Sequence, residues 1–324
     1  MADNMNQMGK ERSGASCIFE RFYTIFARSF LDLFMRLFII LFPLLFLNPE
    51  MNSYSFKEEQ MVFTRVREAY ANKEKVVVKT LAEHSISRDS LRIYLRAFKT
   101  EKKIELWAKN ISDSSFIQIK EFSICEISGS IGPKRRIRDL QVPEGFYHIS
   151  DLNPYSKYYL SMQINYPNAS DSIRGVRGHL GNLIFIHGGC ESSGCIAMTD
   201  DRIKELFVYC IEAYNSGQEK IDMTIFPAKL NDNVYSGLAS RYSRNKDEIS
   251  LWADLKKSYD LFEQTKVPPT VKFLPDGTHE VNKPITIRKQ QGADSLIFRY
   301  KPRPLPARSS LVLPSEGLKR VQTN

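Results

Sequence analysis

Alternation of apolar and polar residues is the clearest pattern in the chain. Residues 91–98 and 104–108 each place apolar side chains at every second position, and a short polar turn separates them. This pattern is typical of a β-hairpin with one face buried. Residues 58–82 instead carry apolar side chains at helical spacing (Met61, Val62, Val66 and Tyr70). A helix is therefore expected before the hairpin.

Further short strands and two further helices are expected along the chain. The predicted strands span residues 116–127, 158–164, 182–186 and 221–226, with short strands around an Asp276–Gly277 turn. The predicted helices span residues 200–214, where Thr199 is a plausible cap, and residues 250–264. The segment from Gly132 to Gly145 reads as a loop. These elements predict a mainly β fold with flanking helices, of the α+β class.

One apolar run near the start of the chain predicts a membrane anchor. Residues 37–47 are continuously apolar, and extending the run back to Phe30 gives the length needed to cross a bilayer. No small-residue cleavage site follows Leu47, so an uncleaved signal anchor is expected through residues 30–47. Lys and Arg precede the run, which orients the N-terminus toward the cytoplasm and the rest of the chain outside the inner membrane.

The net charge of +9 gathers near the C-terminus. From Val281 onward there are nine Lys or Arg against only Asp294 and Glu316, a surplus of seven that is most of the total. A basic tail favours anionic surfaces, although a solvated tail without a specific site is the more common case. No nucleic-acid-binding motif accompanies it, so nucleic acid is not expected as a partner.

The chemistry-bearing segment lies between a predicted buried strand and a predicted helix. Residues 186–200 form a glycine-rich turn that contains His187, Cys190 and Cys195. Nucleophilic catalysis by cysteine needs a thiolate, a base and donors for a developing oxyanion. Cys195 just before a helix start would have a lowered thiol pKa, and His187 at the strand end could face it. Gly188 would allow a backbone carbonyl to approach the imidazole and fix its tautomer.

These residues resemble the active-site motif of the L,D-transpeptidase catalytic domain, or YkuD, family. That motif is a strand ending in His-Gly, a short loop, then Ser/Thr-His-Gly-Cys and a hydrophobic residue. His187-Gly188 and residues 192–196 match it, with Ser193 in place of the usual second His. That departure is typical of the YafK-like branch of murein peptide enzymes. The segments 132–136, 142–147 and 165–168 also resemble that branch, so the resemblance runs from about residue 91 to 227.

The resemblance implies a mixed β-sandwich and a role for each motif residue. Cys195 would be the nucleophile and His187 the base, oriented by the Gly188 carbonyl. The N–H groups of Gly194 and Cys195 would stabilise the oxyanion, and Ser193 would contact substrate. Peptidoglycan stem peptides would be the substrate, attacked at a diaminopimelate carbonyl, and the outcome would be cross-linking or release of murein-attached lipoprotein. Neither a metal nor an organic cofactor is implied.

Several alternatives remain open at this stage. Cys190 could pack, form a disulfide with Cys125 or Cys210, or pair with Cys195. The spacing H-x₂-C-x₄-C also offers three zinc ligands, without an obvious fourth. Arg174 and Arg177 could hold a substrate carboxylate, although surface arginines are more common. A peptidoglycan-binding or assembly protein without catalysis is the second functional hypothesis.

The sequence divides into four expected regions. These are a cytoplasmic N-terminus and signal anchor (1–50), a helical lead-in (51–90), a catalytic domain (91–265) and a C-terminal extension with a basic, Pro-rich tail (266–324). With the resemblance, this organisation predicts a bacterial cell-envelope protein with its catalytic domain in the periplasm.

Overall fold

The computed structural model describes residues 54–284. The predicted anchor through residues 30–47 and the tail from residue 285 lie outside the described residues. Among the residues described, no helix is long and apolar enough to cross a membrane. The expected hairpin is present as β1 (Leu91–Phe98) and β2 (Lys103–Asn110), paired antiparallel with Leu95 opposite Leu106.

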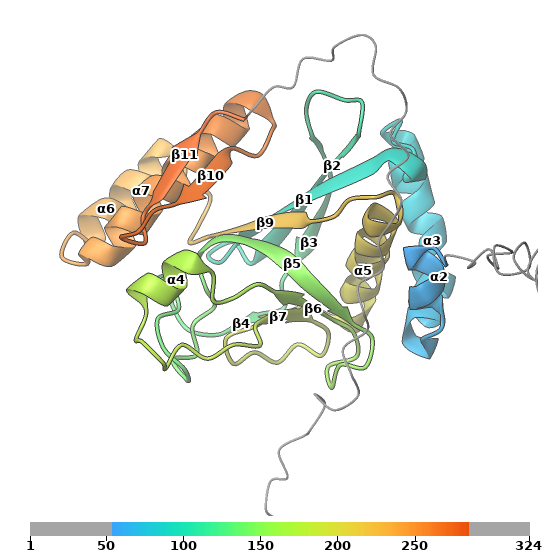
Figure 1. The fold of residues 1–324 in the computed structure, drawn as a ribbon, viewed down its shortest axis with the longest axis horizontal. Coiled ribbons are helices and arrows are strands. Elements are labelled where there is room, and N and C mark those ends of the chain that lie inside the picture. The colour runs from blue at the N-terminus through green and yellow to red at the C-terminus, as the bar shows by residue number, and fades with distance from the viewer. Residues whose placement is uncertain (1–53, 285–324) are drawn as a thin grey trace, which may run out of the picture. The chain divides into compact units, whose positions relative to one another are not determined.

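The predicted strand 116–127 is divided into two strands that join opposite ends of one sheet. β3 (Ile117–Ser123) pairs with β2, whereas β4 (Glu126–Ile127) pairs with β8 (Ile196–Ala197). The strand order of this nine-stranded sheet is β3-β2-β1-β9-β5-β6-β7-β8-β4. Because only two residues separate β3 from β4, the sheet must curl until its two ends approach each other. This curl gives the β-dominated fold that the sequence predicts, with helices outside the sheet (Figure 1).

The middle of the sheet is built from strands of mixed direction. β9 (Ile221–Phe226) lies parallel to β1 and antiparallel to β5 (Gly145–Asn153). β6 (Ser161–Ile164) then pairs with β5 and with β7 (Phe185–His187). The sequence pattern did not single out β5, because Gly145 reads as the end of a loop, whereas in the structure it begins the longest strand.

Three helices cover one side of the sheet (Figure 1). The expected helix 58–82 is interrupted at Val62–Phe63 into α2 (Phe56–Met61) and α3 (Thr64–Glu83), and α2 has its own capping box from Ser55 and Glu58. α5 (Asp200–Asn215) begins after Thr199, whose side chain accepts a hydrogen bond from the Arg202 N–H, as expected for a cap. A short 3₁₀ helix (Arg88–Ser90) leads into β1.

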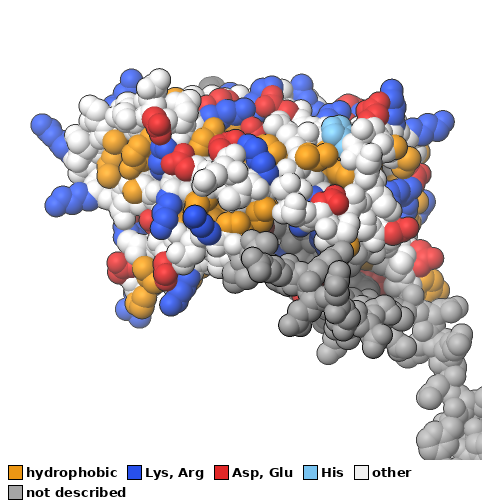
Figure 2. Space-filling view, turned by 90° about the horizontal axis from the view of Figure 1, so that it is seen from above, with side chains coloured by type: hydrophobic (Ala, Val, Ile, Leu, Met, Phe, Trp, Pro, Cys, Tyr) orange, Lys and Arg blue, Asp and Glu red, His pale blue; other side chains and the backbone are white. Residues whose placement is uncertain are grey.

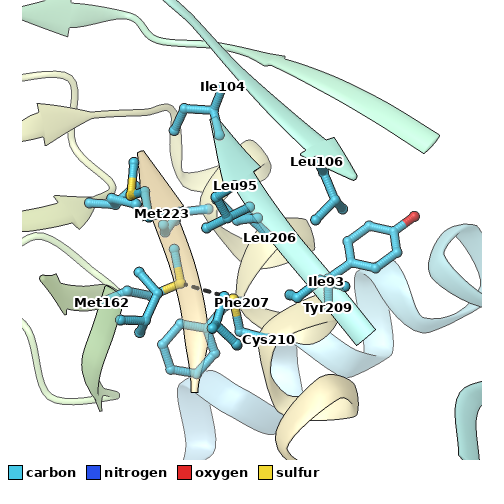
Figure 3. Packing of buried hydrophobic residues seen from close by; sticks show 14 of the residues in the cluster. Ile93, Leu95, Ile104, Leu106, Met162, Leu206, Phe207, Tyr209, Cys210 and Met223 are labelled. Atoms are coloured by element: carbon cyan, nitrogen blue, oxygen red, sulfur yellow. Dashed lines mark hydrogen bonds between the residues drawn. The ribbon is translucent and has the colours of Figure 1, made fainter. Parts of the chain in front are cut away.

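The core lies between α5 and the sheet. Figure 3 shows Leu206, Phe207 and Cys210 of α5 against side chains of β1, β6 and β9, and the Cys210 thiol lies 3.4 Å from the Met162 sulfur. Val66 and Tyr70 of α3 are buried in the same core. The helical lead-in is therefore packed into the domain rather than standing apart from it.

The C-terminal part of the described chain forms a second layer on the other side. It consists of α6 (Asp232–Arg241), α7 (Lys246–Thr265) and the hairpin β10 (Thr270–Phe273) and β11 (His279–Asn282), which turns at Asp276–Gly277 as predicted. Trp252 of α7 donates its indole N–H to Glu144 Oε2 at 2.7 Å, and Glu144 is also paired with Lys99 at 2.8 Å. A short helix, α4 (Ala169–Arg174), precedes β7. Basic and acidic side chains are interspersed over the face in Figure 2.

Candidate active site

The register of β7 and β8 places His187 and Cys195 on the same face of the sheet. These strands are parallel, with Ile186 opposite Ile196 and His187 opposite Ala197. Cys195 is one residue before β8 and therefore lies opposite Phe185. Because side chains two residues apart share a face, His187 and Cys195 point to the same side, with Cα atoms about 8 Å apart on ideal strand spacings.

A hydrogen bond to the neighbouring peptide sets the tautomer of His187. The Nδ1 atom lies 2.6 Å from the Gly188 carbonyl oxygen. A carbonyl only accepts, so Nδ1 carries the proton and Nε2 keeps a free lone pair. The side chain is 2 % exposed, and this burial lowers the pKa of His187, while the Gly188 carbonyl acts in the opposite direction. At neutral pH His187 is therefore a neutral base.

The Tyr158 ring is stacked on the imidazole. The two ring centroids lie 4.5 Å apart with an interplanar angle of 26°. The sequence predicted a strand that begins at Tyr158, but this residue lies before β6 and is 36 % exposed. No local pattern marks this residue, because the contact joins segments about thirty positions apart.

Gly188 fits a space that admits no larger side chain. A Cβ on Gly188 would lie 2.5 Å from Asp200 Oδ1 and 2.9 Å from the Tyr158 carbonyl oxygen. The same Asp200 oxygen accepts the Gly189 N–H at 2.9 Å. The first residue of α5 thus holds the turn that carries the Gly188 carbonyl.

Cys195 does not stand at a helix N-terminus, so the expected lowering of its pKa is wrong. β8 and Met198 intervene before α5, and the half-buried thiol has its pKa raised by burial. The Phe185 N–H and the nearby Lys134 charge act in the opposite direction. The thiol donates weakly to the Leu183 carbonyl, with sulfur and oxygen 3.9 Å apart. Cys195 is therefore a neutral thiol at neutral pH, on the same strand face as the neutral His187.

The pH dependence of Cys195 alkylation follows from this raised pKa. Only the thiolate reacts with iodoacetamide, so the rate at pH 7 is expected to be lower than that of an unstructured cysteine peptide. The rate should rise with pH, with a midpoint above that of the peptide. The alkylation rate is measured by mass spectrometry of samples quenched at successive times. The Cys195→Ala protein corrects for alkylation of the buried Cys210 thiol. A midpoint below that of the peptide would contradict the structure.

The Gly194 N–H is already engaged, contrary to the expectation that it is free for an oxyanion. It donates to Ser128 Oγ at 2.6 Å, and Ser128 Oγ donates to the Leu140 carbonyl at 2.8 Å. Ser192 Oγ donates to the Cys195 carbonyl at 2.7 Å and lies 3.0 Å from Ser128 Oγ. The Cys195 N–H has no hydrogen bond within residues 54–284, which leaves it available. Ser193 is exposed beside it.

A disulfide joins the glycine-rich turn of residues 186–200 to the segment before β4. Cys190 is bonded to Cys125, with Cα atoms 5.5 Å apart, which is one of the pairings that the sequence left open. Because the Cys190 sulfur is bonded, it cannot serve as a thiolate ligand with His187 and Cys195. No cluster of three or more potential metal ligands occurs in the described part of the chain.

Removal of this disulfide is expected to cost stability. The bond closes a separation of 65 residues, for which the chain-entropy estimate is about 4 kcal/mol. The Cys125→Ser, Cys190→Ser double variant should therefore unfold at lower denaturant concentration than the wild type, as measured by circular dichroism. Reduced wild type should behave as the variant does, and equal midpoints for all three would contradict the prediction.

The two candidate arginines differ in their surroundings. Arg174 donates to Asp247 at 2.6 Å, and Arg135 binds the same carboxylate at 2.7 Å, so Arg174 is used within the fold. Arg177 is exposed and has no ion pair with another described residue. Of the two, Arg177 alone is placed to meet a ligand.

A half-buried thiol and an imidazole with a fixed tautomer on one strand face are the groups that thiol-dependent acyl-transfer enzymes use. The model of the L,D-transpeptidase catalytic domain (YkuD) matches residues 104–217. The chain is 37 % identical over 196 residues to the Escherichia coli K12 protein named "Putative L,D-transpeptidase YafK", covering 60 % of this chain and 75 % of the relative. The E. coli O157:H7 protein of the same name matches equally. The chain therefore belongs to the L,D-transpeptidase catalytic domain family, and this membership indicates peptidoglycan-related activity.

Two solved structures match the chain at low similarity. The helical cell shape determining protein Pgp2 from Campylobacter jejuni is 18 % identical, with a TM-score of 0.35 over 61 % of this chain and 80 % of that chain. Bd1075 of Bdellovibrio bacteriovorus is 20 % identical, with a TM-score of 0.32 over 54 % of this chain and 61 % of that chain.

Proposed function

We propose that this protein is a peptidoglycan-modifying cysteine acyl transferase that acts at a diaminopimelate carbonyl of stem peptides. The observation that carries the proposal is the 2.6 Å hydrogen bond from His187 Nδ1 to the Gly188 carbonyl oxygen. It leaves Nε2 as a free base on the strand face that Cys195 shares. Family membership supplies the substrate class.

The reaction begins with proton transfer, because the thiol rests neutral. As Cys195 Sγ attacks the amide carbonyl, its proton moves to His187 Nε2, and a tetrahedral oxyanion forms. The available Cys195 N–H stabilises that oxyanion. The imidazolium then gives its proton to the leaving amine, the C–N bond breaks, and a Cys195 thioester remains. Water or a second amine then attacks the thioester while His187 takes its proton. The C–S bond breaks, and the imidazolium returns the proton to the Cys195 sulfur.

The identity of the attacking group decides between hydrolysis and transpeptidation. Ser193 replaces the histidine usual in the family motif and is exposed next to the nucleophile. The Ser193 hydroxyl can form hydrogen bonds, but unlike a histidine it does not act as a second general base. We place both outcomes within the proposal: release of a murein-attached lipoprotein by hydrolysis, or formation of a new link by an amine.

A digest of purified sacculi tests the proposal. Sacculi that still carry covalently attached protein are incubated with the full-length protein or its Cys195→Ala variant, and products are read by chromatography and mass spectrometry. Release of protein or peptide by the wild type alone indicates a hydrolase, and new cross-links or exchanged terminal residues indicate a transpeptidase. Identical products from both proteins would refute an acyl-transfer function on this substrate.

The occupied Gly194 N–H favours a second candidate, a peptidoglycan-binding or assembly protein without catalysis. A domain that only binds would need neither a free oxyanion donor nor an accessible thiolate. Such a protein should pellet with sacculi equally well as the wild type or as Cys195→Ala, and it should yield no products with either.

We also propose a location in the cell envelope, with the catalytic domain in the periplasm and residues 30–47 as the anchor. The Cys125–Cys190 disulfide supports an oxidising compartment. Fractionation of cells that express the full chain, followed by non-reducing mass spectrometry, tests this. Soluble protein in the cytoplasm with free Cys125 and Cys190 thiols would contradict it.

A further inference from the structure

Two loops that the catalytic roles above do not use border the nucleophile. In the first, comprising residues 134–141, the Leu140 carbonyl accepts the Ser128 hydroxyl that binds the Gly194 N–H. In the second, comprising residues 176–183, the Leu183 carbonyl oxygen lies 3.9 Å from Cys195 Sγ. Both loops therefore end beside the reacting thiol.

Backbone hydrogen bonds join the two loops. The Ile137 N–H donates to the His179 carbonyl at 2.6 Å, and the Val176 N–H donates to the Arg135 carbonyl at 2.8 Å. A Cβ added to Gly181 would lie 3.2 Å from Ile137 Cγ1, so the loops are also in close contact. They form one continuous surface.

A buried carboxylate holds the first loop in a single conformation. Asp139 is paired with Lys134 at 2.5 Å, and these side chains are 10 % and 5 % exposed. The same carboxylate accepts the N–H groups of Arg135 and Arg136 at 3.0 Å and of Gln141 at 3.1 Å. Such a network fixes the loop before any ligand binds.

Both loops hold ordinary residues in the left-handed region of backbone conformation. Arg138, Leu140 and Leu183 have φ angles of 60°, 57° and 63°. This conformation is unfavourable for a residue with a Cβ, and such strain is concentrated at functional sites. In this protein the three residues with positive φ angles also have exposed side chains.

The exposed side chains combine aliphatic and cationic groups. Ile137, Leu140 and Leu183 are 51 %, 52 % and 56 % exposed. The neighbouring Lys134, Arg135 and Arg174 are neutralised by ion pairs. The exposed guanidinium groups of Arg136, Arg138 and Arg177 have no ion pair within residues 54–284. We name the set the arginine rim: Arg136, Ile137, Arg138, Leu140, Arg177 and Leu183.

The geometry points to the arginine rim as a docking surface for an acidic polypeptide segment with apolar side chains. Arginine is enriched at protein interfaces, and the buried core of an interface is more apolar than its rim. A polypeptide supplies carboxylates and large apolar side chains along one chain, whereas a short stem peptide supplies carboxylates with little apolar surface. The inference rests on the proposed function, because the docked segment would be the protein joined to peptidoglycan next to the bond that Cys195 attacks.

Peptide binding to the full-length Cys195→Ala protein tests the surface without catalysis. The probes are three fluorescein-labelled twelve-residue peptides that alternate leucine with glutamate, glutamine or lysine. Fluorescence anisotropy is expected to show the glutamate peptide binding at least tenfold more tightly than the glutamine peptide, and the preference should weaken with added salt. Equal affinities for all three peptides would overturn the inference.

Charge reversal then locates the binding. The Arg136→Glu, Arg138→Glu, Arg177→Glu variant should lose at least tenfold in affinity for the glutamate peptide, whereas Lys75→Glu on the exposed face of α3 should not. Unchanged affinity in the triple variant would place the peptide elsewhere, for example on the basic residues after 284, and would overturn the inference.

The apolar half of the surface has its own test. Leu140→Asn and Leu183→Asn remove the aliphatic groups but keep a residue that tolerates positive φ. Together they should weaken binding several-fold with no fall in melting temperature, and unchanged binding would exclude an apolar contribution. Binding of the acidic peptide with no products from sacculi would leave the docking surface standing while refuting the acyl-transfer function.

Discussion

The Cys195→Ala variant is expected to lose activity on sacculi by a factor on the order of 10⁴ or more. In the proposed mechanism the thiol forms the covalent intermediate, and alanine offers no nucleophile in its place, so only non-covalent contributions to rate would remain. The side chain is half-buried and donates only one weak hydrogen bond, so its removal should leave the fold intact. Product formation in the sacculus digest measures the loss.

Cys210→Ala is the matched control, because Cys210 is the other free cysteine described. It is fully buried against Met162, far along α5 from the catalytic turn, so its removal should reduce stability modestly but leave activity close to that of the wild type. Activity retained by the Cys195→Ala protein, at a melting temperature near that of the wild type, would sink the proposed mechanism.

The His187→Gln variant is expected to lose activity by about 10²- to 10⁴-fold near pH 7, the range typical of a lost general base. Glutamine has similar polarity but does not accept the thiol proton. Because burial raises the pKa of Cys195, almost no thiolate exists at that pH without His187. Above the thiol pKa, Cys195 ionises without a base, so the defect in acylation should shrink as pH rises.

A pH series of single-turnover thioester formation, followed by intact-protein mass spectrometry, measures this recovery. His84→Gln is the matched control, since His84 lies at the end of α3 and its side chain bonds only the Thr80 carbonyl among the described residues. It should behave as the wild type does at every pH. A His187→Gln defect that stays constant across the series would show that His187 supports structure and does not take the proton.

Short-range sequence patterns were sufficient to predict the elements that are defined by neighbouring residues. The β1–β2 hairpin, the start of α5 at Thr199 and the β10–β11 turn all occur where alternation, a cap residue and an Asp-Gly pair predict them. The division of residues 116–127 into β3 and β4 was missed, because both halves read as strand. Their separation to opposite ends of the sheet depends on curvature that accumulates over all nine strands.

The chemistry of the site divides in the same way. The sequence by itself determined the family and placed His187, Gly188 and Cys195 in one turn, because a strand and its following loop carry all three. Only the tertiary structure decided the hydrogen bonds, the packing and the pKa values of these groups. Ser128 occupies the Gly194 N–H, Tyr158 stacks on His187, and burial raises the pKa of Cys195, although its position in the sequence suggests the reverse. Each of these effects comes from a segment brought to the turn by the curled sheet, and electrostatic and packing energies depend on distance in space, which the order of residues does not contain.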